Sequence, residues 1–263
     1  MKRLHFTYDM QIEYSIEVST CNYTIKCIPC DTLRQKINNI KIDLSPKSNY
    51  QWGTDGFSNT QIWGANSEPH NSFNFHIEGD AQTGLSEVET DVDEDQLMIF
   101  RHPHGLNVAG ESIKSFFKDL QINIDSDKST YDLMLCIMHA LYEKYSYVSG
   151  STNVDTSAEE AFSQGKGVCQ DYAHIMISLM HLAKIPARYV TGFIIGEGES
   201  HAWVEVEMNG KWIGVDPTHD RMVNDDYIKI GHGRDAKDCM INRGIMHGGG
   251  QHTQSVQVSV QEM

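Results

Sequence analysis

The dipeptide Asn209-Gly210 constrains this chain most, because it lies between two runs of alternating apolar and polar residues. Asn-Gly is the strongest short signal for a two-residue type I′ turn, so residues 201–208 and 211–216 are predicted to form a β-hairpin. A two-residue loop also fixes which residues face each other. The predicted pairs are Met208 with Lys211, Val206 with Ile213, Val204 with Val215 and Trp203 with Asp216.

This register sorts the hairpin side chains onto two faces, because side chains alternate along a strand. One predicted face is apolar and holds Val204, Val206, Ile213 and Val215. The other face, which the apolar core does not need, holds His201, Trp203, Glu205, Trp212 and Asp216. His201 and Asp216 are diagonal neighbours there, about 7 Å apart at the backbone, so the carboxylate can reach the imidazole unless a bulge intervenes.

A long amphipathic helix is predicted to begin at Cys169. Its apolar stripe consists of Tyr172, Ile175, Met176, Leu179, Met180 and Ala183, at helical spacing. At the N-terminal end of a helix, unpaired N–H groups and the helix dipole favour a thiolate. A lone cysteine is more often a small buried apolar residue. Together with a paired His201 and Asp216, however, Cys169 indicates nucleophilic catalysis.

The rest of the chain predicts two domains. Short alternating runs over residues 3–80 indicate an all-β domain, and the acidic stretch 85–96 indicates a domain boundary. Helical periodicity follows over residues 113–120 and 131–145. We therefore predict a β-rich N-terminal domain over 1–95 and an α+β catalytic domain over 96–263.

Charge and hydropathy exclude several classes of partner. The formal net charge is −15 and no Lys/Arg cluster interrupts the acidic background, which argues against nucleic acid and anionic membranes as partners. No apolar run approaches the ~20 residues that span a bilayer. The N-terminal residues lack the apolar run of a secretory signal, so we expect a cytoplasmic protein.

The cysteines and histidines predict neither a metal nor a cofactor. We expect most of the six cysteines to be free thiols; Pro29 disfavours a redox role for Cys27 and Cys30, and no second cysteine pair completes a zinc site. An EF-hand loop is excluded because Gln96 stands at its glycine position. His219 and the other scattered histidines form no i, i+4 metal motif. His174 is interpreted as a structural residue, with a place in the cleft as the alternative.

Several motifs resemble the transglutaminase-like superfamily of cysteine enzymes, in particular its bacterial branch of cysteine proteases. They are DTSAEEAF, GKGVCQDYAHIMISLMHLAKIPARYVTGFI, SHAWVEV and WIGVDPTH. The resemblance covers roughly residues 130–235, and the β-rich N-terminal part is similar to the domain that precedes the catalytic one in this branch. It implies a papain-like α+β core, acyl-enzyme chemistry without a cofactor, and Cys169, His201 and Asp216 as catalytic residues. It also offers Tyr147 as an oxyanion donor, with simple packing as the alternative.

Three function classes stay open. They are a cysteine peptidase or amidase that hydrolyses amide bonds, a transglutaminase that moves a glutaminyl acyl group to an amine, and an idle binding or scaffold domain. We favour hydrolysis of a peptide or protein substrate, because the similar bacterial proteins are described that way and no calcium-loop signature appears. The sequence leaves the substrate's identity and the oligomeric state open.

Overall fold

The computed structural model describes residues 1–92, 97–120 and 129–263. The strands of its large, eight-stranded sheet are β1 (Lys2–Ile25), β2 (Gln35–Ser45), β3 (Tyr50–Thr54), β4 (Thr60–Asn66), β5 (His70–Thr83), β10 (Gly196–Gly198), β15 (Asn242–Gly248) and β16 (His252–Glu262). A six-stranded sheet contains β6 (Thr90–Asp91), β9 (Ala187–Ile194), β11 (His201–Met208), β12 (Lys211–Asp216), β13 (Arg221–Met222) and β14 (Tyr227–Gly233).

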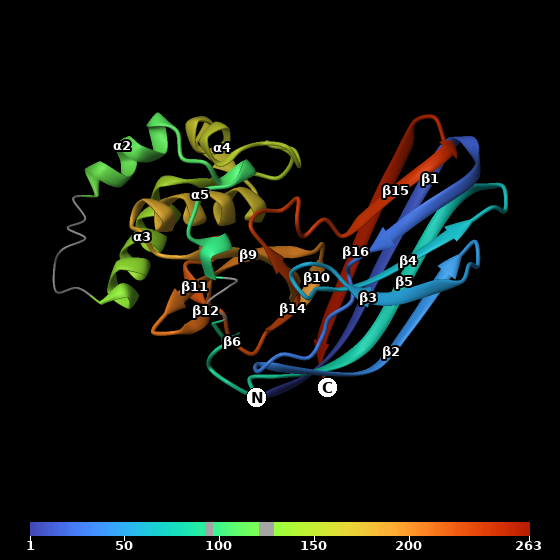
Figure 1. Ribbon diagram of the computed structural model, residues 1–263, viewed down its shortest axis with the longest axis horizontal. Helices are drawn as coiled ribbons and strands as arrows, with labels where there is room; N and C mark the ends of the chain where they lie inside the picture. Colours follow the sequence, from blue (N-terminus) through green and yellow to red (C-terminus); the bar gives the residue numbers. More distant parts are fainter. Residues whose placement is uncertain (93–96, 121–128) are drawn as a thin grey trace.

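The helices gather on the side of the six-stranded sheet that lies away from the large sheet (Figure 1). They are α2 (Glu111–Asp119), α3 (Thr130–Lys144), α4 (Ala158–Gln164) and α5 (Cys169–Leu182), with 3₁₀ turns η1 (Met98–Phe100) and η2 (Gly105–Asn107). A short parallel pair is formed by β7 (Ser146–Tyr147) and β8 (Lys166–Gly167). The predicted α+β class is therefore confirmed, and α2 and α3 occupy the two stretches with helical periodicity. None of the described helices combines the length and apolarity that a transmembrane span needs.

The long strand β1 organises the large sheet. Its first half lies between β5 and β16, and its second half lies between β4 and β15. Alternate side chains of β1, such as Leu4, Phe6 and Tyr8, are buried in one core, as the alternating pattern predicts. The all-β prediction for this region is confirmed.

The large sheet also contains the last strands of the chain. β15 and β16 pair with β1, so the predicted catalytic range 96–263 contributes strands to both sheets. Residues 93–96, the last four of the predicted acidic boundary at 85–96, lie outside the described residues. Asp127, a residue that could cap the helix predicted over 131–145, lies outside them as well. The division at residues 95 and 96 stays a prediction.

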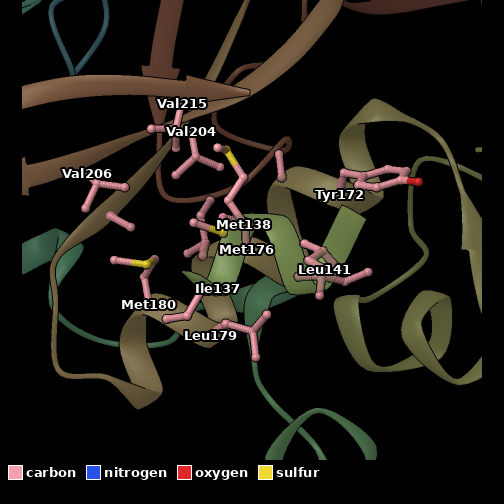
Figure 2. Close-up of a cluster of buried hydrophobic side chains, with 14 of the residues drawn as sticks. Ile137, Met138, Leu141, Tyr172, Met176, Leu179, Met180, Val204, Val206 and Val215 are labelled. Carbon is pink, nitrogen blue, oxygen red and sulfur yellow. The ribbon is translucent and has the colours of Figure 1, made fainter. Parts of the chain in front are cut away.

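The hairpin register is confirmed where the two strands pair. Met208 faces Lys211, Val206 faces Ile213 and Val204 faces Val215. The apolar face of the hairpin packs against α5 and α3, where Val204, Val206 and Val215 meet Met176 and Met180 (Figure 2). Every residue of the predicted apolar stripe of α5 belongs to this core.

The opposite face of the hairpin differs from the prediction, because it too is buried. Trp203 and Trp212 are almost fully covered, and Glu205 lies among cations at 1% exposure. The Lys229 Nζ donates to both carboxylate oxygens of Glu205 at 2.8 Å, and Arg188 makes a further buried ion pair with Glu205. Burial of a charge is tolerated when it is paired in this way, a compensation that strand periodicity does not reveal.

Candidate active site

Cys169 is the first residue of α5, at the end where the helix leaves backbone N–H groups unpaired. The turn before it is fixed by Asp171, whose carboxylate accepts the Val168 N–H at 2.8 Å and the Thr152 hydroxyl at 2.6 Å. Asp171 is almost fully buried, so it serves the local structure of this turn. The Cys169 side chain itself is partly exposed. A thiol in this position is accessible and faces the positive end of the helix dipole.

His201 begins β11 and lies between Cys169 and Asp216. Its Nε2 is 2.8 Å from the Asp216 Oδ2, and its ring lies close enough to the Cys169 thiol for the two groups to interact. Because Asp216 engages Nε2, the Nδ1 atom is the ring nitrogen left for the sulfur. The structure thus brings together the three residues that the sequence assigns to the site.

The Asp216 carboxylate is fully buried and accepts several hydrogen bonds. Its Oδ2 receives the Tyr227 hydroxyl at 2.6 Å and lies 2.7 Å from the His219 Nδ1, while its Oδ1 accepts the Thr218 N–H at 2.9 Å. These donors hold the carboxylate in place and satisfy a charge that would otherwise be costly to bury.

The pKa values of His201 and Asp216 are shifted in opposite directions. Burial alone would lower the pKa of His201, but its hydrogen bonds to Asp216 and Cys169 outweigh burial and raise the pKa to about 10. Burial alone would raise the pKa of Asp216, yet hydrogen bonds from His201 and His219 bring it below its ordinary value. A protonated imidazole beside an ionised carboxylate follows from these directions.

Tyr147 lies beside the nucleophile on β7. Its backbone pairs with Gly167, two residues before Cys169, and its side chain is 56% exposed. Burial first, and then the charges of Cys169 and Glu199, raise the pKa of Tyr147, so its phenol stays a hydrogen-bond donor at neutral pH. This position is compatible with donation to a bound substrate oxygen, and its exposure disfavours the packing alternative.

His174 does not line the cleft. It is fully buried, and its Nε2 accepts the Ala236 N–H at 3.1 Å. Burial lowers the pKa of His174 to about 4, so the imidazole is neutral. These contacts agree with a structural role.

The sequence interpretation missed His219 and Tyr227. The DPTH run places His219 three residues after Asp216, and a turn brings its imidazole back onto the carboxylate. Tyr227 begins the separate strand β14, so its approach to Asp216 depends on tertiary structure. In the sequence, the short spacing between Asp216 and His219 in the DPTH run could have indicated this contact of His219, but it indicated nothing about Tyr227.

His201, Asp216 and His219 also form a group with donor atoms suitable for a metal. One ligand atom from each lies within 4.8 Å of the others. The Asp216 Oδ2, however, already has hydrogen-bonding partners in His201, His219 and Tyr227. An ion bound here would have to displace the hydrogen bonds that the two imidazoles make with the Asp216 carboxylate.

The other cysteines lack the surroundings of Cys169. All six thiols are free, and Cys27 and Cys239 are buried, which raises the pKa of each. Burial likewise raises the pKa of Cys30. Cys136 is exposed on α3. Among the described residues, Cys169 alone has both a helix N-terminus and an imidazole partner.

Comparison with known proteins identifies the family of this chain. Residues 118–217 match the family model of the transglutaminase-like superfamily, and residues 4–82 match that of the bacterial transglutaminase-like N-terminal region. The chain belongs to the transglutaminase-like superfamily. The first match includes Cys169, His201 and Asp216, and the second covers β2, β3 and β4 and most of β1 and β5 in the large sheet.

Curated relatives of this transglutaminase-like chain occur in mycobacteria. An uncharacterized protein of Mycobacterium leprae is 37% identical over 127 residues, which are 44% of this chain and 45% of the relative. One of Mycobacterium tuberculosis is 35% identical over 123 residues, 41% of this chain and 39% of the relative. The chain thus matches less than half the length of these relatives.

Among solved structures, the "Putative Cysteine Protease from Cytophaga hutchinsonii" has the same fold. The TM-score is 0.81 and the sequence identity 24%, and the alignment covers 100% of this chain and 91% of that protein. The arrangement of both sheets with the helices is therefore shared with this transglutaminase-like chain.

Proposed function

We propose that this transglutaminase-like chain is a cysteine peptidase or amidase that hydrolyses amide bonds through Cys169, His201 and Asp216. The observation that carries the proposal is the position of His201, between a buried carboxylate at 2.8 Å and a partly exposed thiol at a helix N-terminus. This arrangement supplies a nucleophile, a base and a group that orients the base.

In the proposed first step, the thiolate sulfur of Cys169 attacks the carbonyl carbon of the amide. The carbon–nitrogen bond breaks, and the His201 imidazolium gives its proton to the leaving amine. The product is an amine and a thioester between the acyl group and Cys169. Asp216 holds the imidazole ring in place and stabilises its protonated form.

The second step releases the acyl group. His201, now neutral, takes a proton from a water molecule, and the water oxygen attacks the thioester carbon. The carbon–sulfur bond breaks, which yields a carboxylic acid and returns the thiolate–imidazolium pair. In both steps, the Cys169 backbone N–H, free at the first helical position, and the Tyr147 hydroxyl are the proposed donors to the oxyanion.

Hydrolysis and transamidation share this thioester and differ in what attacks it. The test is to incubate the protein with glutaminyl peptides, with and without a primary amine, and to identify the products by mass spectrometry. We expect cleaved or deamidated peptide even when the amine is present, and no product from the Cys169→Ala variant. Predominant amine incorporation would assign a transglutaminase instead. No product from any peptide would favour an idle domain.

A further inference from the structure

The large sheet has a groove on its outer face, on β1, β3, β4 and β15, far along the chain from Cys169. The groove has a volume of about 1020 Å³. Side chains directly opposite on neighbouring strands share a face of the sheet. Gln51, Trp63, Thr24 and Arg243 therefore form one row across the four strands, and Ala65, Asn22 and Ile245 form a parallel row.

Trp63 is held flat on the floor of this groove. A Cβ atom on Gly53 would lie 2.6 Å from the Trp63 ring, so the ring rests directly on a residue without a side chain. The indole is nevertheless 39% exposed. An exposed aromatic ring that is held in one position provides a surface on which a ligand can stack. Its side-chain entropy is already reduced in the free protein, so little more is lost when a ligand binds.

The polar side chains that line the groove around Trp63 are uncharged, apart from one arginine. Asn22 and Gln51 are exposed, and each amide offers both donors and an acceptor. The Arg243 guanidinium is oriented by the Lys237 carbonyl oxygen and still has N–H groups to spare. None of the described residues that line the groove has a carboxylate, although the chain carries a net charge of −15.

We propose that this groove binds an oligosaccharide, with one pyranose ring stacked on Trp63 and its hydroxyl groups bound by Asn22, Gln51 and Arg243. The C–H face of a pyranose ring complements the negative face of the indole, and adjacent hydroxyl groups match the donor and acceptor pairs of the amides. Because no described carboxylate lies in the groove to repel a negative charge, the groove also accommodates sugars that carry an acidic group.

The strand arrangement and the charge of the groove disfavour a peptide or a nucleic acid as its ligand. An extended peptide would add to a free strand edge, which at this groove belongs to β3 or β15, whereas Trp63 is on β4, between β1 and β3. A nucleic acid would need several cations, and Arg243 is the only Lys or Arg among the lining residues. The proposed site is independent of the Cys169 chemistry.

The chain offers a matched control for Trp63. Trp52 is on the neighbouring strand β3 and is 50% exposed, but it is paired with Ile62, so its side chain points to the other face of the sheet. The two tryptophans share residue type, sheet and exposure, and differ in the face that they occupy (Figure 1 places β3 beside β4).

The test is isothermal titration of the whole protein with cellotetraose, maltotetraose, chitotetraose and tetragalacturonate. We expect saturable binding of at least one sugar. Trp63→Ala should weaken it at least about tenfold, because the stacking surface is lost, whereas Trp52→Ala should bind like the wild type. If circular dichroism shows that Trp63→Ala does not fold, the exposed substitutions Asn22→Ala and Gln51→Ala test the proposal in its place. Each should weaken sugar binding several-fold. Binding of none of the four sugars, or wild-type affinity in the groove variants, would overturn the proposal.

Discussion

His201 and Asp216 stand on adjacent strands, β11 and β12, with the imidazole Nε2 2.8 Å from the carboxylate Oδ2. The hairpin turn at Asn209-Gly210 fixes this relationship, because it sets the register in which Val204 faces Val215. A local turn therefore sets the positions of the base and of the carboxylate that orients it in the proposed site.

The three residues should not contribute equally to turnover. Cys169→Ala should abolish it, and His201→Ala should lower kcat/KM by about three orders of magnitude or more, because the base acts in both steps. Asp216→Ala should cost less, since Asp216 only orients and stabilises the imidazole. The double variant of His201 and Asp216 should be little worse than His201→Ala alone. Steady-state kinetics on one peptide checks this order, and additive losses would show that the two residues act separately.

The alkaline side of the pH profile should depend on Asp216. The leaving amine needs the protonated His201, whose pKa lies at about 10, so kcat/KM should fall as the pH rises through that region. Asp216→Asn removes the charge that helps to raise this pKa, so the fall should move to lower pH. A profile of kcat/KM from pH 6 to 11 measures both. An unmoved alkaline limb in Asp216→Asn would contradict the assignment of the orienting carboxylate.

His219 should matter less than Asp216. It contacts the carboxylate that orients His201, but Tyr227 and the Thr218 N–H also hold that carboxylate. We expect His219→Ala to reduce kcat/KM several-fold, while the control His247→Ala, an exposed change on β15, leaves it unchanged. A loss as large as that of Asp216→Ala would mean that His219 has a direct part in the chemistry.

The hairpin and the helix could be predicted from sequence because their signals are local. Asn209-Gly210 sets the register, and the spacing from Tyr172 to Ala183 sets the buried face of α5. The contacts of Tyr227 with Asp216 and of Lys229 with Glu205 could not be predicted, because β14 reaches them through its pairing with β9. For the same reason no local pattern revealed that β16 completes the N-terminal sheet.

His174 should make the fold sensitive to mild acid. Burial lowers its pKa from 6.5 to about 4, so between these pH values the unfolded chain carries a proton that the folded chain does not. The free energy of unfolding should therefore decrease as the pH falls from 6.5 to 4, by on the order of 3 kcal/mol. His174→Gln lacks this term, so its stability relative to the wild type should improve over the same range. Urea unfolding at several pH values measures the free energy of unfolding of both proteins. The same dependence on pH in His174→Gln and in the wild type would contradict the prediction.

Thiol labelling should single out Cys169. Cys136 is the fair comparison, because it is exposed but has no imidazole partner among the described residues, whereas Cys27 and Cys239 are buried. We expect iodoacetamide to modify Cys169 first at pH 7, and His201→Ala to remove this preference. Time-resolved labelling followed by peptide mass spectrometry gives the order. Faster labelling of Cys136, Cys27 or Cys30 would argue against an activated Cys169.

The most direct test of the central claim is capture of the acyl-enzyme. The protein is mixed with an activated peptide ester, quenched with acid within the first turnover, digested and measured by mass spectrometry. The proposed function requires a thioester on Cys169 that forms in the wild type, is lost in Cys169→Ala, and accumulates slowly in His201→Ala. An acyl group found on another residue, or full turnover by Cys169→Ala, would contradict the account.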